Sequence, residues 1–178
     1  MVRLEQRNEY ATDSYINANY INDSRGQRVF IAAQGPMPST RENFWRMVVQ
    51  EQVSLIVMLT SLKEYGKTKC DQYWPDKHYQ FDGRYEVQLT SQEKLMPGLV
   101  RRQFCINRES QQHSVVTQLQ FEAWPDHGAP EQRDFHLVEV LLLMIQECWQ
   151  RDGTSRKIVV HCSAGIGRTG SLIAIFNL

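Results

Sequence analysis

The sequence lacks several features that would place the chain in a specialised class. Its longest apolar run, residues 140–145, is too short to span a bilayer, and the N-terminus has no signal-peptide pattern. The 20 Lys and Arg residues balance the 20 Asp and Glu residues, so no overall charge attracts nucleic acid or an anionic membrane. We therefore expect no nucleic-acid partner and no direct membrane contact, and an anionic substrate must be met by local charge.

Cysteine is also scarce. The four cysteines have spacings that fit neither a disulfide framework nor a zinc site; they are Cys70, Cys105, Cys148 and Cys162. This pattern favours a reducing compartment, and it predicts that the first three are small core residues. The sequence predicts no metal and no cofactor.

The remaining composition is that of one ordinary globular domain of 178 residues, 42% hydrophobic and 22% charged, without repeats or low-complexity segments. Alternation or β-branched runs predict strands at residues 15–21, 29–34, 53–59, 85–89, 100–106, 114–121 and 157–160. Capping-box spacing over residues 39–42 predicts that a helix starts there. Apolar spacings of three and four predict a second helix over residues 131–151, with Phe135 on its buried face, and an apolar run predicts a third after Arg168.

The most informative stretch begins with the β-branched strand at residues 157–160. It continues through a short loop of mostly small residues, Ser163 to Gly167, into the helix that follows Arg168. A strand, a tight loop and a helix N-terminus together form an anion-binding arrangement, because backbone N–H groups converge there and the helix dipole adds positive potential. A Walker A loop is excluded, since no Gly-Lys-Ser/Thr follows the glycines.

This loop holds a cysteine and an arginine six positions apart, Cys162 and Arg168. The helix N-terminus and the guanidinium both favour the thiolate, so the pKa of Cys162 should fall below its usual value of about 8.5. The planar guanidinium of Arg168 fits two phosphoryl oxygens. The pattern therefore indicates phosphoryl transfer to a cysteine nucleophile.

Residues 161–170, His-Cys-Ser-Ala-Gly-Ile-Gly-Arg-Thr-Gly, resemble the signature loop of the classical protein tyrosine phosphatases, including the receptor-type enzymes. The resemblance implies an α/β fold with a highly twisted mixed sheet flanked by helices. It also implies that residues 1–178 are one phosphatase domain.

The resemblance implies a role for each residue of the loop. Cys162 would attack phosphorus, and Thr169 would stabilise the thiolate when the phosphoenzyme breaks down. His161 would hydrogen-bond nearby backbone and support the loop. The residues that would hold the phosphoryl oxygens are Ser163, Ala164, Gly165, Ile166, Gly167 and Arg168.

Residues 124–130, Trp-Pro-Asp-His-Gly-Ala-Pro, resemble the mobile acid loop of the same family, and His127 occurs there in receptor-type relatives. The family assigns Asp126 to protonate the leaving phenolate, which needs the proton because a phenol has a pKa of about 10. Bound phosphate and loop closure would raise the pKa of Asp126. Trp124 would anchor one end of the loop.

Two residues of the charged stretch 63–75 also match the family. Glu64 corresponds to the acidic residue that orients the signature arginine, Arg168. Lys69 corresponds to a lysine that approaches the general acid, Asp126, when its loop closes.

The match covers about residues 2–178, and we expect the domain to be incomplete at both ends. The Asn-Arg-Tyr pattern of the family's phosphotyrosine-recognition loop is absent near the N-terminus. The family's Gln-containing loop, which places the hydrolytic water, is absent after the signature helix.

The function predicted first is hydrolysis of phosphotyrosine in proteins, without a metal, in the cytoplasm or in the intracellular part of a membrane receptor. An alternative is a weak or inactive phosphatase domain that binds phosphotyrosine and regulates. Retention of Cys162, Arg168 and Asp126 argues against that alternative, while the missing water-positioning loop argues for it. A dual-specificity or lipid phosphatase is a further alternative, disfavoured by the acid loop and the upstream strands.

Overall fold

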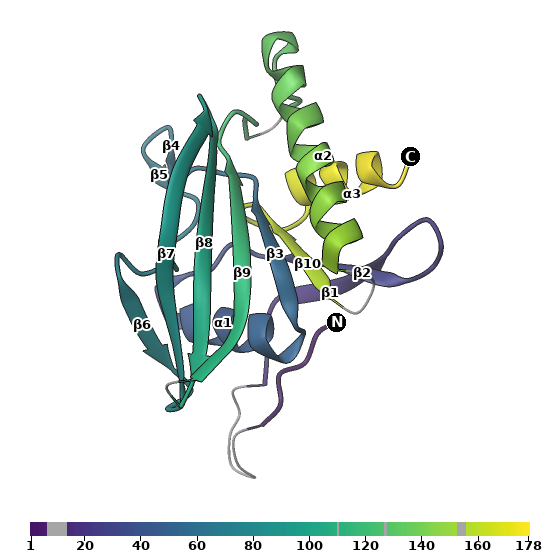
Figure 1. Ribbon diagram of the computed structural model, residues 1–178. Helices are drawn as coiled ribbons and strands as arrows, with labels where there is room; N and C mark the ends of the chain where they lie inside the picture. Colours follow the sequence, from purple (N-terminus) through teal and green to yellow (C-terminus); the bar gives the residue numbers. More distant parts are fainter. Residues whose placement is uncertain (7–13, 110, 127, 153–155) are drawn as a thin grey trace.

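A single twisted sheet of eight strands organises the chain in the computed structural model, which describes residues 1–6, 14–109, 111–126, 128–152 and 156–178 (Figure 1). The helices are α1 (Arg41–Gln50), α2 (Phe135–Asp152) and α3 (Gly167–Phe176). The strands of the large sheet are β1 (Ala18–Asn22), β2 (Arg28–Ala33), β3 (Val53–Met58), β6 (His78–Phe81), β7 (Tyr85–Met96), β8 (Leu99–Arg108), β9 (Gln111–Phe121) and β10 (Lys157–His161). Two short strands, β4 (Lys63–Glu64) and β5 (Lys67–Thr68), pair separately.

The strand order is β1-β2-β10-β3-β9-β8-β7-β6. The four strands β2, β10, β3 and β9 are mutually parallel, and antiparallel strands extend the sheet on both sides. The central strand β3 is buried along its whole length, as expected for a strand covered on both faces. The predicted α/β class with a twisted mixed sheet and flanking helices is therefore confirmed.

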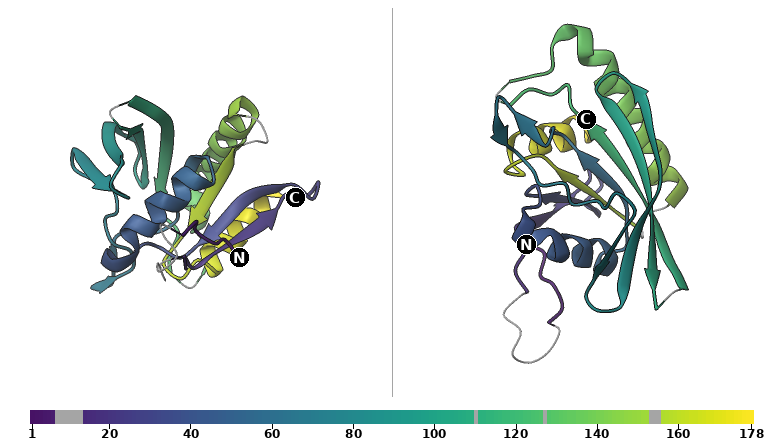
Figure 2. Two further views of the ribbon diagram at one scale, coloured as in Figure 1. Left: turned by 90° about the horizontal axis from the view of Figure 1, so that it is seen from below. Right: turned by 90° about the vertical axis from the view of Figure 1, so that its left-hand side faces the viewer.

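Helices cover both faces of the sheet, and each face has its own core (Figures 1 and 2). Helix α1 packs Phe44 and Trp45 into the first core, together with residues of β8 and β9. Helices α2 and α3 build the second core, in which Leu141 and Leu172 pack against β10 and β3 residues. The sheet thus forms a rigid platform whose parallel strands end at one edge.

The helix starts differ from the sequence prediction. The segment before α1 forms a 3₁₀ turn, Pro38–Thr40, in which the Thr40 hydroxyl accepts a hydrogen bond from the Met37 backbone N–H at 3.0 Å. The predicted capping box at residues 39–42 was therefore wrong, although the helix follows directly. A second 3₁₀ turn, Gln132–Asp134, precedes α2, so the helix begins at Phe135, whose side chain is exposed rather than buried.

The strands predicted between residues 79 and 124 exist, but β7 to β9 are longer than their apolar alternation indicates, and β6 adds a fourth. The charged stretch 63–75 contains the small ribbon β4–β5 and not only loop. Cys70 is buried as predicted, whereas Cys105 and Cys148 are only partly buried.

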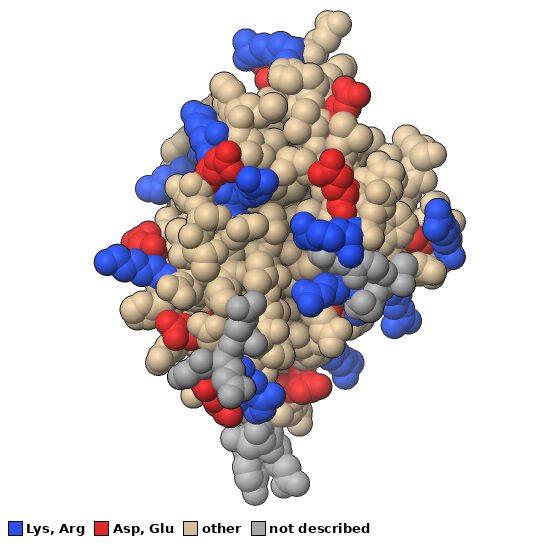
Figure 3. All heavy atoms as spheres, viewed as in Figure 1, with Lys and Arg blue, Asp and Glu red and all other residues tan. Residues whose placement is uncertain are grey.

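The surface agrees with the balanced charge of the sequence. Figure 3 shows Lys and Arg interspersed with Asp and Glu on one face. Within the described ranges, every helix is too short or too polar to cross a lipid bilayer.

Candidate active site

The site lies where β10 ends and the chain turns through residues 162–166 into α3. Because β10 lies between two parallel strands, this turn sits at the edge formed by their carboxyl ends, where open α/β sheets bind ligands. The turn passes close to β2. Gly165 has a φ of +77°, and a Cβ there would lie 2.3 Å from the carbonyl oxygen of Ala33. Only glycine fits both requirements.

The Cys162 thiol is buried at the base of the turn, 3.3 Å from the backbone N–H of Gly165. Burial alone would raise the pKa of this thiol. The nearby hydroxyl and backbone N–H of Thr169, the Gly165 N–H and the charge of Arg168 outweigh burial, so the pKa is lowered. The buried thiol of Cys70 has no such donors, and burial raises its pKa to about 12.

The lowered pKa of Cys162 has the direction that the sequence predicts, but the causes differ in weight. Thr169 comes before the charge of Arg168 among the contributions that lower the pKa. The residues of the loop alone predict a lowered pKa from the guanidinium and the helix N-terminus. Thr169, which the family resemblance assigns to stabilise the thiolate, lies within the first turn of α3.

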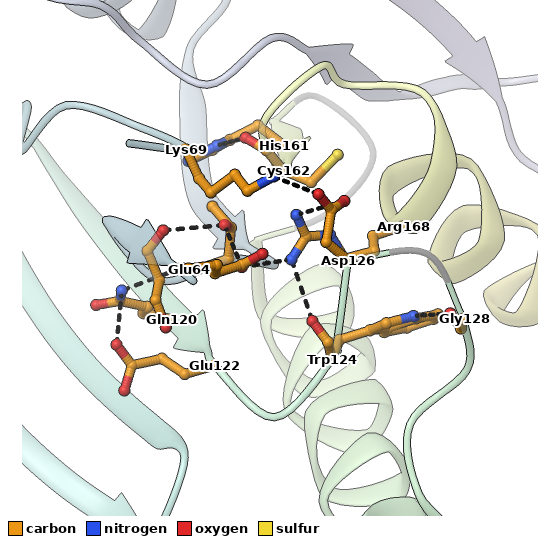
Figure 4. Close-up of polar contacts among 12 residues, drawn as sticks. Glu64, Lys69, Gln120, Glu122, Trp124, Asp126, Gly128, His161, Cys162 and Arg168 are labelled. Atoms are coloured by element: carbon orange, nitrogen blue, oxygen red, sulfur yellow. Dashed lines mark hydrogen bonds and ion pairs between the residues drawn. The ribbon is translucent and has the colours of Figure 1, made fainter. Parts of the chain in front are cut away.

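Arg168 is held on several sides. Its side chain is only 5% exposed, and one guanidinium nitrogen donates to the carboxylate of Glu64 at 2.7 Å and to the Trp124 carbonyl at 3.1 Å. The other terminal nitrogen lies 3.3 Å from the Asp126 carboxylate. Figure 4 shows Arg168 between Glu64 and Asp126. A guanidinium fixed in this way loses little rotamer entropy when it binds an oxyanion.

The Asp126 carboxylate also makes an ion pair with Lys69. Trp124, 4% exposed, supports this loop by donating its indole N–H to the Gly128 carbonyl at 3.0 Å. The expected approach of Lys69 to Asp126 is therefore present in this conformation. His127 of the same loop lies outside the described residues.

These groups surround a cavity of about 530 Å³, which is lined by Lys69, Asp126, Gly128, Cys162, Ser163, Ala164, Gly167, Arg168 and Ser171. A thiol of lowered pKa, a guanidinium and a carboxylate thus face one space. Such a space can bind a tetrahedral anion and bring a nucleophile and an acid to it. Within the described part of the chain, no three His, Cys, Asp or Glu side chains gather to hold a metal ion.

The other predicted site residues do not line the cavity. Thr169, Trp124 and His161 are buried outside its lining. Glu64 contacts Arg168 from the side away from Cys162 (Figure 4). Ile166 is 77% exposed, so only its backbone can serve the loop.

His161 is completely buried, and its ring is bonded at both nitrogens. Nδ1 lies 3.1 Å from the Cys162 carbonyl oxygen, and Nε2 lies 2.9 Å from the Tyr73 hydroxyl. Burial lowers the pKa of His161 to about 4 despite the backbone bond, so the ring is neutral near pH 7.

Sequence reasoning missed Gly128 and Ser171, which line the cavity, and Tyr73, which supports His161. Ser171 lies one helical turn beyond Gly167 in α3, so helical spacing from the loop would have found it. Tyr73 is 88 residues from His161, and no pattern in the sequence links the two.

Comparison with known proteins gives one family across the chain. The family described as protein-tyrosine phosphatase matches residues 1–178. Receptor-type tyrosine-protein phosphatase eta of Gallus gallus is 44% identical over 168 residues, which is 94% of this chain and 12% of the relative. Receptor-type tyrosine-protein phosphatase S of Gallus gallus is 44% identical over 161 residues, covering 90% of this chain and 10% of the relative. The chain thus spans only a small part of these relatives.

Solved structures agree with the sequence relatives. The crystal structure of the catalytic domain of human protein tyrosine phosphatase non-receptor type 18 superposes with a TM-score of 0.83 at 32% identity, covering 99% of this chain and 62% of that one. A structure of PTPN18 in complex with HER2-pY1248 phosphopeptides gives a TM-score of 0.84, also at 32% identity, and covers 99% of this chain and 64% of that one.

Proposed function

Because the chain belongs to the protein-tyrosine phosphatase family, we propose that it hydrolyses phosphotyrosine in proteins through a cysteinyl-phosphate intermediate. The observation that carries the proposal is the shared cavity, in which a thiol of lowered pKa, Cys162, faces Arg168 and Asp126. Phosphotyrosine partners are supported by the similar structures of PTPN18 bound to phosphopeptides of HER2.

In the first proposed step, the Cys162 thiolate attacks phosphorus and the bond from phosphorus to the tyrosine oxygen breaks. The leaving phenolate takes its proton from Asp126. Arg168 and the backbone N–H groups of residues 163–167 hold the other phosphoryl oxygens, aided by the N-terminus of α3. The hydrogen bond from Arg168 to Glu64 keeps the guanidinium aimed at them.

In the second step, water attacks phosphorus and the bond from phosphorus to sulfur breaks. Asp126, now ionised, accepts the proton of the water, and inorganic phosphate leaves. The departing thiolate is stabilised by the polar groups of Thr169 that lower the pKa of Cys162. We propose that no metal takes part, because Arg168 and the loop amides supply the positive field that Mg²⁺ supplies in other phosphoryl transfers.

A second candidate function is binding of phosphotyrosine without turnover. The same cavity would hold the phosphoryl group, and the chain would act as a regulatory domain. The presence of Asp126 beside Arg168, at 3.3 Å, favours chemistry over binding alone, because a binding module has no need for an acid at that position. We further propose that residues 1–178 act as one domain in the cytoplasm, on the intracellular side of a receptor-type parent, as its relatives' names suggest.

The proposed function is tested by turnover of a phosphotyrosine peptide by the 178-residue chain. Sustained release of phosphate that Cys162→Ser abolishes supports hydrolysis. A burst of about one equivalent with trapped phosphocysteine shows that the first step occurs and the second does not. The absence of any burst from a folded sample refutes the enzymatic proposal, and peptide binding by that sample then identifies the regulatory alternative.

A further inference from the structure

A buried arginine lies in the sheet, outside the site just described. Arg102 of β8 is 7% exposed, and its guanidinium stacks over the Trp74 ring at 4.2 Å. Its Nε donates to the side-chain oxygen of Gln92 at 2.6 Å. One terminal nitrogen donates to the side-chain oxygens of both Gln118 and Gln120, each at 2.8 Å. Burial lowers the pKa of Arg102, so this charge is held at a cost.

The cross-strand register explains this cluster. Arg102 lies directly opposite Gln92 of β7 on one side and Gln118 of β9 on the other. Gln118 and Gln120 are two residues apart, so both point to the same face of the sheet. Gln118 is fully buried and Gln120 is 3% exposed. Three glutamine oxygens therefore surround one guanidinium on the α1 side of the sheet.

The first branch leads from Arg102 to the nucleophile. The Gln118 amide donates to the Tyr73 hydroxyl oxygen at 2.6 Å, and that hydroxyl lies 2.9 Å from His161 Nε2. Chemistry fixes the direction of each bond. Arginine only donates, and the Cys162 carbonyl only accepts, so His161 carries its proton on Nδ1 and Nε2 accepts from Tyr73. Every donor in this series of hydrogen bonds, from Arg102 to His161, therefore points toward Cys162.

The second branch leads from Arg102 to the signature arginine. The Gln120 amide donates to the Thr60 carbonyl at 3.2 Å. The hydroxyl of the same Thr60 donates to the Glu64 carboxylate at 2.7 Å. The oxygen of Glu64 that accepts from Thr60 also accepts from Arg168 at 2.7 Å. Figure 4 shows this path from Gln120 to Arg168.

We propose that Arg102 is a positioning residue that holds both Cys162 and Arg168 in place for the proposed reaction. A planar guanidinium has a fixed fork of donors, so it can orient two amides at once. The bonds to Gln118 and Gln120 are charge-assisted and buried, which strengthens them relative to bonds in water. Loss of Arg102 would free the side-chain amides of Gln118 and Gln120 to rotate. The hydrogen bonds that lead from them to Cys162 and to Arg168 would then lose their fixed orientation.

Four variants separate this role from a general contribution to packing. Arg102→Met keeps an unbranched stem over Trp74 and removes every donor. Gln118→Met and Gln120→Met each cut one branch and leave Arg102 in place. Arg101→Met is the matched control, because Arg101 is the next residue of β8 and makes an exposed ion pair with Glu93 at 2.6 Å.

Two measurements report on the two ends without requiring turnover. The rate at which iodoacetamide alkylates Cys162, followed on the Cys162 peptide by mass spectrometry, gives its thiolate fraction as a function of pH. Protection of Cys162 from alkylation by inorganic phosphate gives the affinity of the site for phosphate, which depends on Arg168. The charged groups facing the thiol, Lys69, Asp126 and Arg168, are present in all four variants.

We expect Gln118→Met to raise the midpoint pH of alkylation by about 0.5 unit or more, with phosphate protection retained. Gln120→Met should weaken phosphate protection about tenfold and leave the midpoint in place. Arg102→Met should do both, and Arg101→Met neither. The proposal is overturned if the two glutamine variants fail to separate the two measurements, or if a folded Arg102→Met variant changes neither.

The glutamine variants decide the matter alone if Arg102→Met does not fold, which urea unfolding establishes. Failure of the proposed function would give a different result. The wild-type protein would release no phosphate from a phosphotyrosine peptide, yet Gln118→Met would still change only the alkylation midpoint and Gln120→Met only the phosphate protection. Wild-type turnover combined with undivided effects would instead refute positioning by Arg102 and leave the phosphatase proposal intact.

Discussion

Replacing His161 by asparagine should remove a pH-dependent part of the folding stability. The ring is fully buried, and its pKa falls from 6.5 to about 4 in the folded protein. Between these values the unfolded chain binds a proton at His161 and the folded chain does not. Stability is therefore complete above the unfolded pKa and is lost as the pH falls from about 6.5 towards 4.

The shift sets the size of the effect. A difference of about 2.5 pKa units, at 1.36 kcal/mol per unit, corresponds to roughly 3 kcal/mol when both pKa values have been passed. About 2 kcal/mol of this should be lost between pH 7 and pH 5. Asparagine offers an amide N–H close to the position of His161 Nδ1 and does not titrate, so the His161→Asn variant should lose less over the same range.

Urea unfolding followed by tryptophan fluorescence, at about pH 5, 6 and 7, measures the free energy of unfolding for each protein. The control is His78→Asn, which removes an exposed histidine. Carboxylates titrate in both proteins, so the informative quantity is the difference in slope between wild type and variant. Parallel pH profiles for wild type and His161→Asn would refute the assignment of a buried, neutral ring.

Three further predictions concern the site and its loop. Asp126→Asn should lower kcat about 10²- to 10³-fold for phosphotyrosine and far less for an aryl phosphate whose leaving group is weakly basic, as steady-state kinetics with both substrates would show. Glu64→Gln should weaken inhibition by inorganic phosphate about tenfold, because it removes the charge that holds Arg168 at 2.7 Å; an unchanged inhibition constant would contradict this. Gly165→Ala should lower the free energy of unfolding by more than about 2 kcal/mol, since its Cβ would meet the β2 backbone at 2.3 Å. Gly170→Ala, with open space around it, is the control and should be neutral or stabilising, and urea unfolding measures both variants.

The fold was predictable where burial leaves a clear pattern. The nearly continuous apolar run of β3 and the β-branched β10 are found from sequence because both faces of these strands are covered. The second half of β7 has no such pattern, since residues 90–94 are polar and exposed. Its strand conformation comes from pairing with β8, including the ion pair between Glu93 and Arg101. Strand formation that depends on pairing with another strand cannot be predicted from the local alternation of apolar and polar residues.

Some residues of the candidate site were likewise predictable from the sequence and others were not. Cys162 and Arg168 lie within one short loop and helix turn, so sequence spacing alone predicts that they act together, whereas the role of Thr169 came from the family resemblance. Asp126 and Glu64 could be assigned only through family resemblance, because 42 and 104 residues separate them from Arg168. Apart from His161, which the family resemblance assigned to it, the support beneath the loop was not predicted. Gln118 and Gln120 do leave a signal, since two polar side chains alternate within the otherwise apolar end of β9.

The place of β10 in the sheet has a consequence for how the protein is made. It is the last described strand in the chain, yet it fills the position between β2 and β3. Before it arrives, the hairpin β1–β2 and the strands β3 to β9 share no strand pairing in the described ranges, and each presents an open, largely apolar edge. Such edges pair readily with other chains. Bringing β10 between two strands that precede it by many residues is slow, because distant segments must first meet. A nascent chain therefore passes through an aggregation-prone stage, and β10 ends that stage in the same event that delivers Cys162 to its site.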